Sequence, residues 1–352
     1  MHMSRGVIIY GAGAMGTAVL HLLENKGEKI EAVVDKNDNL TGSFIDGVKI
    51  ITPDLVQHNQ KQQCDFLVSM SACSYKEIEQ YLDSIGVKHI YNAGDYIQTL
   101  YPEESFAGVW KMKENEYEEL LSLNDFWSDE LSKLQYMAAL NWFKNRNEKI
   151  STKKLQINRT KYYPDVICNS IKNCTTMVDT GIRNGEFIRT FEELSSSEIR
   201  AYGFMLHPDI YRIEDVRESF KDNSDIIVDD YELSDAKKEI TISRLGLMDP
   251  FTEIKNMKIH TTTLDDYFKK IPYDFLRIYS MSSVINIISG GKQTIETYRP
   301  VIAVNISHYH DDFIDVPRLL KLMLNDYNFY FRMHSFQGND CIFYAIPQDG
   351  NN

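Results

Sequence analysis

A glycine-rich turn between a strand and a helix is the first feature of this sequence that could do chemistry. The segment VDTGIRNGEFIRTF covers 178–191 and places Asp179, Gly181, Gly185 and Glu186 after a short apolar strand. Many Rossmann-like domains hold an adenosyl cofactor on such a turn, because a backbone without side chains lets the ligand approach closely. We therefore predict a cofactor-binding turn at these four residues.

A second glycine-rich turn lies near the N-terminus, in the run VIIYGAGAMG. Gly11 would allow the tight turn, Gly13 would let the backbone approach a phosphate, and Gly16 would let the helix pack on the strand. Asp35 closes the next strand, EAVVD, about 20 residues later, where an acid can accept hydrogen bonds from ribose hydroxyls. The pattern fits NAD(P) or a nucleotide sugar as ligand, and it also fits a purely structural use of the glycines.

The run SHYHDD brings two imidazoles and two carboxylates together at the end of another strand, in His308, His310, Asp311 and Asp312. Residues at alternate positions of an extended segment share one face, so His308 and His310 are expected on one side. Two imidazoles do not complete the coordination shell of a divalent metal. We predict no metal site here.

The composition limits the classes of partner. The chain has 352 residues, with 38 Lys and Arg against 51 Asp and Glu, and a formal net charge of −13. That charge repels phosphate polyanions and anionic membranes, so we expect no nucleic-acid partner. No apolar run approaches the roughly 20 residues of a bilayer span, and the N-terminus lacks the apolar core of a signal peptide. We expect a cytoplasmic protein whose five cysteines, without a C-x-x-C pair, are reduced thiols.

The length suffices for two domains, each with its own core. Strand-like and helix-like segments alternate in 1–112 and again in 153–352, which predicts an α/β protein with two Rossmann-like domains. The last two strands, NFYFRMHS and CIFYAI, leave no room for a helix between them and should form an antiparallel hairpin at a sheet edge. Residues 113–152 are predicted to form a helical connector, with an apolar face of Leu123, Trp127, Leu131, Leu134 and Ala138.

The first 97 residues resemble the small Rossmann-like domains that precede acyltransferase or methyltransferase domains in bacterial glycan-biosynthesis proteins. The resemblance is carried by YGAGAMG, AVVDKN, GVKIITPDLV and DFLVSMSACSYKEI. It implies a small nucleotide-binding domain and argues against a complete dehydrogenase, because no second Rossmann half follows. Ser69, Ser71 and Ser74 either line the carboxyl edge of this sheet or cap the next helix.

From Met177 to Pro347 the chain resembles the FkbM family of S-adenosylmethionine-dependent methyltransferases. The motifs are VDTGIRNGEF, AYGF followed by Pro208, TTTLDDYF, YDFLRI, GGKQTIETYRPVIAV, SHYHDDFIDVP and YNFYFRMHS with IFYAI. The resemblance implies the seven-stranded sheet of class I methyltransferases, S-adenosylmethionine as cofactor, and O-methylation of a sugar or glycan precursor. It also implies His308 as the base that removes the hydroxyl proton. Because the edge strand runs back toward that face, His334 is expected near by.

Several positions depart from the family pattern. Met205 stands where the family has a glutamate for the ribose hydroxyls, and Tyr279, Met281 and Val284 replace its acidic strand end. Losing a charged acceptor of buried hydroxyls costs about 1.5–3 kcal/mol. We therefore predict a partly degenerate cofactor site.

Two further substitutions, Ile182 and Arg183, make the glycine turn bulkier than is usual in the family. The alternatives to an O-methyltransferase are a catalytically inactive methyltransferase-like binding or scaffold protein, and a protein that binds NAD(P) or a nucleotide sugar through its N-terminal domain. The expected substrate is a small molecule or a glycan precursor, and a homo-oligomer is left open. Tyr279 could donate a hydrogen bond to a ligand or only pack at the strand end.

Overall fold

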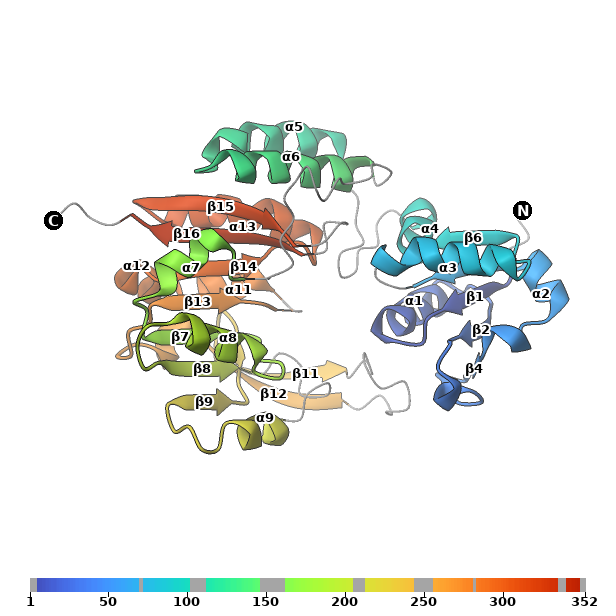
Figure 1. Ribbon diagram of the computed structural model, residues 1–352, viewed down its shortest axis with the longest axis horizontal. Helices are drawn as coiled ribbons and strands as arrows, with labels where there is room; N and C mark the ends of the chain where they lie inside the picture. Colours follow the sequence, from blue (N-terminus) through green and yellow to red (C-terminus); the bar gives the residue numbers. More distant parts are fainter. Residues whose placement is uncertain are drawn as a thin grey trace. The chain divides into compact units, whose positions relative to one another are not determined.

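The protein forms two compact α/β units. Their helices and strands are labelled in the computed structural model of Figure 1. The structure describes residues 5–69, 72–101, 112–145, 162–204, 213–243, 256–280, 283–334 and 340–348. One unit comprises Met1–Glu104 with Ser243–Met257, and the other comprises Ser105–Ile242 with Lys258–Asn352. Among the helices in these ranges, none is both long and apolar enough to cross a membrane.

The N-terminal unit is built on a six-stranded sheet of order β3-β4-β2-β1-β5-β6. Its neighbouring strands are parallel except for the hairpin of β3 with β4, which confirms the predicted parallel sheet. After β1 the chain builds β2, β3 and β4 on one side of it and then crosses back to place β5 on the other side. The carboxyl ends of β1 and β5 therefore flank the switch point where such sheets bind ligands. The elements are β1 Val7–Tyr10, α1 Ala14–Asn25, β2 Ile30–Val34, β3 Phe44–Ile45, β4 Val48–Ile51, α2 His58–Gln63, β5 Asp65–Val68, α3 Ala72–Ser84, β6 His89–Asn92 and α4 Ala93–Leu100.

The C-terminal unit contains the predicted seven-stranded sheet, of order β15-β16-β14-β13-β7-β8-β9. β16 is antiparallel to both neighbours, which confirms the edge hairpin. The strands are β7 Thr176–Asp179, β8 Arg200–Phe204, β9 Ile226–Asp229, β13 Phe275–Ile278, β14 Val301–Asn305, β15 Tyr327–Met333 and β16 Cys341–Pro347. The helices are α5 Glu114–Leu121, α6 Glu130–Asn145, α7 Asp165–Ile171, α8 Glu186–Leu194, α9 Ile213–Ser219, α10 Leu264–Tyr267, α11 Val284–Ser289, α12 Lys292–Tyr298 and α13 His310–Met323.

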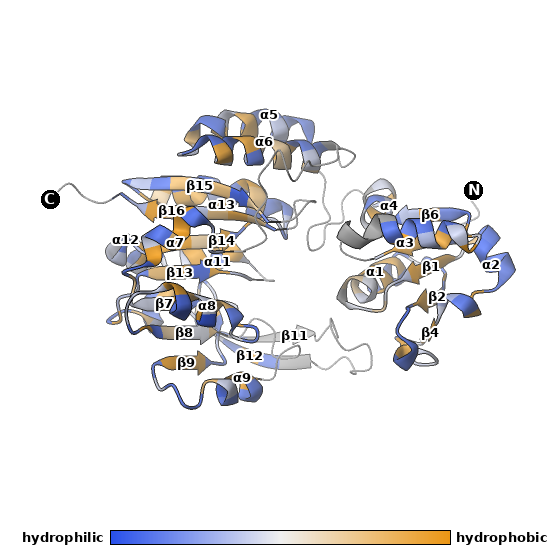
Figure 2. Cartoon of the chain, viewed as in Figure 1, coloured by the Kyte–Doolittle hydropathy of each residue, from blue (hydrophilic) through white to orange (hydrophobic). Residues whose placement is uncertain are grey.

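Two apolar clusters cover the two faces of this sheet. Because successive side chains of a strand point to opposite faces, Met177 and Phe275 enter the cluster with α7, α8 and α9. Val178 and Leu276 enter the other cluster, with α5, α6 and α10 to α13. Figure 2 shows the apolar residues concentrated on the central strands. The sheet is therefore buried on both faces, and its carboxyl edge is the place left for polar chemistry.

A separate small sheet follows β9 and was not anticipated from the sequence. Its order is β10-β12-β11, with β10 Glu232–Leu233, β11 Glu239–Ser243 and β12 Asn256–Thr262. The sequence showed strand-like segments here. It did not show that they pair with one another rather than with the main sheet, because local alternation does not specify a partner.

The helix α6 lies along the outer edge of β15 and provides polar partners to it (Figure 1). The backbone N–H groups of Phe331 and Met333 donate to Ser132 Oγ at 3.0 Å and to Gln135 Oε1 at 2.7 Å. The predicted apolar face of this segment is therefore wrong in part, because Leu134 is 41 % exposed while Ser132 is buried. The buried face carries polar residues because a sheet edge presents N–H groups that need acceptors.

Replacing Gln135 by leucine is expected to destabilise the C-terminal unit by about 1–3 kcal/mol, because the buried N–H of Met333 would lose its acceptor. The control Leu134→Gln changes an exposed neighbour and should stay within about 0.5 kcal/mol. All three tryptophans of the chain, Trp110, Trp127 and Trp142, fall in this unit. Urea unfolding followed by tryptophan fluorescence therefore measures the difference, and equal midpoints for the two variants would contradict the assignment.

Candidate functional site

The glycine turn of the C-terminal unit joins β7 to α8 at the centre of the sheet. Asp179 ends β7, and its Oδ1 accepts the backbone N–H of Gly181 at 3.0 Å. A Cβ on Gly181 would lie 2.7 Å from the backbone oxygen of Tyr279. Gly185 has a φ of +79°, and a Cβ there would lie 2.4 Å from the ring of Phe220. Both glycines are thus required by the backbone itself.

The bulky residues of the turn do not fill it. Ile182 is completely buried, and its side chain occupies the space that Gly203 leaves on the adjacent strand β8. Arg183 adopts a left-handed conformation with a φ of 51°, and its Nη1 lies 3.5 Å from Glu186 Oε1. Of the two larger side chains, one therefore enters the core and the other pairs with the first residue of α8.

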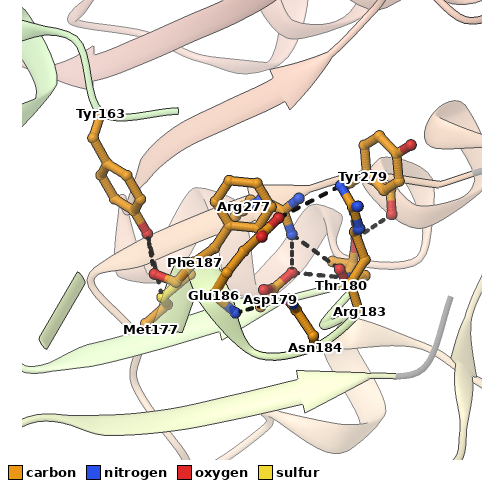
Figure 3. A network of polar contacts seen from close by, with 11 residues as sticks. Tyr163, Met177, Asp179, Thr180, Arg183, Asn184, Glu186, Phe187, Arg277 and Tyr279 are labelled. Carbon is orange, nitrogen blue, oxygen red and sulfur yellow. Dashed lines mark hydrogen bonds and ion pairs between the residues drawn. The ribbon is translucent and has the colours of Figure 1, made fainter. Parts of the chain in front are cut away.

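Arg277 is a charged residue beneath this turn that was not predicted from the sequence. Its strand register places Arg277 opposite Asp179, and the two side chains form an ion pair with both side chains fully buried. The same guanidinium group donates from Nη1 to the carbonyl oxygen of Gly181 at 3.1 Å (Figure 3). A signal was present in the run FLRI, because a charge between apolar strand residues needs a buried partner.

The strand ends that carry the substituted positions are described in part. Tyr279 follows β13, and its backbone N–H donates to Thr180 Oγ1 at 3.0 Å, which ties it to the glycine turn. Val284 is 1 % exposed and belongs to the apolar core under α11, so it does not face the edge. Met205 and Met281 lie outside the described residues.

His308 lies at the same edge, beyond the end of β14. Its ring packs edge-on against the ring of Tyr279, with centroids 5.2 Å apart. Tyr279 therefore contacts both the predicted cofactor turn and the predicted base. Tyr279, which replaces an acidic residue of the family pattern, thus links the predicted cofactor turn to His308.

His310 is held away from any shared site with His308. Its Nε2 lies 2.9 Å from Glu116 Oε2 on α5, and its Nδ1 lies 2.9 Å from Asp311 Oδ1. Burial alone would lower the pKa of His310, but these two acidic partners outweigh it and raise the pKa. The expectation of a common face is wrong, because β14 ends at Asn305 and the period-two pattern does not continue into α13. Within the described ranges no cluster of three metal-ligating residues is found.

Two further polar residues belong to this region of the unit. Asp312, in the first turn of α13, is 5 % exposed, and burial, together with Asp311 and Asp315, raises its pKa to about 7. His334 is 4 % exposed, and its Nε2 lies 3.0 Å from the hydroxyl of Tyr344 on β16. The partner of His334 is thus part of the sheet itself.

A cavity of about 720 Å³ lies beside β12 and α10, with Lys237, Lys238 and Tyr267 among its lining residues. Lys237 Nζ is 3.3 Å from Asp266 Oδ2, and Lys238 Nζ is 3.2 Å from Asp235 Oδ1. Since each lysine already has an acidic partner, the cavity shows no net preference for an anion.

The three glycines of the N-terminal turn differ in whether the fold requires them. Gly11 has a φ of +110°, and a Cβ on Gly16 would lie 1.8 Å from the carbonyl oxygen of Gly11. Gly13 is exposed with a φ of −79°, and nothing lies within 4 Å of a Cβ placed there. Asp35 accepts backbone N–H groups with both oxygens, from Ala12 and from Asn37, each at 2.8 Å. The fold thus explains Gly11 and Gly16 but not Gly13.

Of the three serines near this turn, Ser69 has a structural role. Its hydroxyl donates to the carbonyl oxygens of Tyr10 at 2.9 Å and Gly11 at 3.3 Å. Ser71 and the side chain of Ser74 lie outside the described part of the chain.

Comparisons with known proteins give different relatives for the two parts of the chain. Residues 3–90 match the family model described as C2185-like, N-terminal. The redox-sensing transcriptional repressor Rex of Bacillus subtilis (strain 168) is 30 % identical over 88 residues, which are 24 % of this chain and 41 % of that repressor. The chain therefore spans less than half of that relative.

Among solved structures, the chain is similar to the methyltransferase FkbM from Methylobacillus flagellatus KT, with a TM-score of 0.68 and 16 % identity. The match covers 97 % of this chain and 90 % of that one. Fibrillarin from Aeropyrum pernix, solved with S-adenosyl-L-methionine, matches at a TM-score of 0.33 and 10 % identity, over 50 % of this chain and 68 % of that one. With the strand order above, the first likeness establishes that the chain contains a methyltransferase fold.

Proposed function

We propose that the C-terminal unit binds S-adenosylmethionine and methylates a hydroxyl of a sugar or glycan precursor. The observation that carries the proposal is the position of Tyr279, whose backbone hydrogen-bonds to the glycine turn and whose ring packs on His308. A cofactor turn and a proton acceptor would thus lie on either side of one residue, as transfer to an oxygen requires. The acceptor class comes from the resemblance to FkbM methyltransferases.

The residues present fit the amino acid end of this cofactor. Ile182 enters the core and Arg183 pairs with Glu186, and the first turn of α8 presents backbone N–H groups to a carboxylate. The N–H groups of Gly181 and Gly185 are bonded to Asp179 and to the carbonyl oxygen of Ile182, so these glycines shape the turn. Bound S-adenosylmethionine supplies an activated methyl group. His308 would take the proton of the acceptor hydroxyl at its neutral imidazole. Tyr279 would orient that imidazole by ring contact.

Calorimetric titration with S-adenosylmethionine, S-adenosylhomocysteine, NAD and NADP tests the proposal directly. We expect micromolar binding of the two adenosyl compounds. His308→Gln should keep that binding and lose methyl transfer, because the side chain no longer accepts a proton. Binding heat with NAD or NADP, and none with either adenosyl compound, would assign ligand binding to the N-terminal unit instead.

The substituted ribose position gives a gain-of-function test. Met205→Glu is expected to tighten S-adenosylhomocysteine binding about tenfold to a hundredfold, because a carboxylate can accept both ribose hydroxyls. Met205→Gln, which is polar but uncharged, is the matched control and should gain less. Unchanged affinity in both variants would mean that the pocket has been shaped for another ligand.

A second candidate function, nucleotide or dinucleotide binding by the N-terminal unit, is favoured by Gly13. The fold does not require a glycine there, while a phosphate approaching the start of α1 would. Each oxygen of Asp35 accepts one backbone N–H, from Ala12 of the turn and from Asn37, and keeps a second lone pair for a ribose hydroxyl. The effect of substituting Gly13 therefore distinguishes a ligand-binding role of the turn from a structural role.

A further inference from the structure

Arg277 contacts the candidate cofactor turn at two points. Its Nη1 donates to Asp179 and to the carbonyl oxygen of Gly181, so one nitrogen holds both the strand end and the first turn residue. The carboxylate of Asp179 in turn accepts the N–H of Gly181. Donor and acceptor of the same peptide segment are thus fixed by one ion pair (Figure 3).

Aromatic rings hold the guanidinium group in place. Its Cζ lies 3.7 Å from the ring centroid of Phe187 in the first turn of α8, and 4.2 Å from that of Tyr162. The ring centroid of Tyr279 is 5.4 Å away. Burial alone would lower the pKa of Arg277, but Asp179 outweighs it and raises the pKa, so the group stays charged. A charged, planar group stacked in this way has one orientation.

The pair is not arranged for stability alone. Arg277 and Asp179 are both fully buried, and in the described part of the chain Arg277 Nε, Arg277 Nη2 and Asp179 Oδ2 have no hydrogen-bond partner. For a buried ion pair with unsatisfied atoms the desolvation penalty can exceed the Coulombic gain, and apolar residues of the same volume often serve stability as well or better. What the pair provides in addition is a fixed geometry at the turn.

We infer that Arg277 is a positioning residue, which sets the conformation of the turn 179–185 through Asp179 and Gly181. The part of this inference that concerns ligand binding rests on the proposed function, since it is the adenosyl cofactor that would need the turn. The part that concerns the conformation of the turn does not depend on that function.

The test compares Arg277→Met and Arg277→Lys with Arg332→Met. Arg332, on the edge strand β15 of the same sheet, is a matched control. It is 8 % exposed, and its Nη2 lies 2.5 Å from Asp129 Oδ2. Amide hydrogen exchange of a peptide over 179–187 reports the turn without any ligand, and titration with S-adenosylhomocysteine reports the site. Tryptophan fluorescence confirms that each variant is folded.

We expect Arg277→Met to speed exchange in the 179–187 peptide about tenfold and to weaken S-adenosylhomocysteine binding by a similar factor. Arg277→Lys should restore only part of both, because an ammonium group keeps the charge opposite Asp179 but lacks the planar group that stacks on Phe187. Arg332→Met should change neither. Exchange in Arg277→Met as slow as in the control would overturn the inference, whereas a wild type that binds no adenosyl compound with the exchange result intact would overturn only the proposed function.

If Arg277→Met does not fold, the double variant Asp179→Asn with Arg277→Met replaces the pair by neutral groups and should fold. Its Gly181 N–H keeps an amide oxygen as acceptor, while the Gly181 carbonyl has lost its donor. Faster exchange of the 179–187 peptide than in wild type is then expected. Wild-type exchange in this double variant would equally overturn the inference.

Discussion

Gly16→Ala is expected to destabilise the N-terminal unit by about 3 kcal/mol. The added Cβ would lie 1.8 Å from the carbonyl oxygen of Gly11 and 3.0 Å from Ser69 Oγ. The first of these atoms is backbone, so relief requires α1 to move away from β1, and both elements are buried in the core of the unit. Hydrogen exchange of peptides covering β1 and β5 measures the loss. Tryptophan fluorescence of the C-terminal unit should remain as in wild type.

Gly13→Ala is the matched control in the same turn. A Cβ there meets nothing within 4 Å, and the φ of −79° suits alanine, so the cost should stay under about 1 kcal/mol at this N-cap position. If the turn binds a phosphate group, Gly13→Ala should nevertheless weaken NAD or NADP binding about tenfold. Wild-type stability with wild-type affinity in Gly13→Ala would show that the turn is structural. Equal destabilisation by both substitutions would contradict the steric account.

The fold could be predicted from the sequence because its signals are local and repeated. The alternation of strand and helix segments gave both parallel sheets, and the short link between β15 and β16 gave the antiparallel hairpin. The small sheet of β10, β11 and β12 could not be predicted in the same way, because its existence depends on which strands pair.

The candidate site could be predicted only where a residue acts through its own type and spacing. Gly181 and Gly185 could be named from the strand, glycine turn and helix around them, and His308 from the resemblance to FkbM methyltransferases. Their functional roles stay predictions. Arg277 was not predicted, and Asp312 was named only as one of two neighbouring carboxylates. The role of each depends on its burial, which a strand pattern or a helix start does not reveal. Leu134 was assigned to the apolar face of α6 because the sequence does not show that this helix also lies along a sheet edge, whose N–H groups take Gln135 as an acceptor on the buried side.

Asp312→Asn is expected to stabilise the C-terminal unit at pH 8 and to leave it nearly unchanged at pH 4. The carboxyl is 5 % exposed with a pKa of about 7, raised by burial and by the neighbouring Asp311 and Asp315. In the unfolded chain it ionises near pH 3.9, so between these values the folded state binds the additional proton and stability falls as pH rises. The full difference corresponds to roughly 4 kcal/mol above pH 7, taken as an upper limit.

Urea unfolding followed by tryptophan fluorescence at pH 4, 6 and 8 measures this prediction. The gain in Asp312→Asn should grow with pH through the interval, while Asp222→Asn, at an exposed position of the same unit, should show no such trend. A pH-independent difference would mean that Asp312 is ionised in the folded protein, or that it has found a partner. A gain that follows the expected pH profile would show that the chain retains a destabilising carboxyl three residues after Tyr309, whose own pKa is raised by burial, by Asp312 and by Tyr279. Such a cost is the usual sign of a functional constraint, and here it would fall beside the proposed base His308.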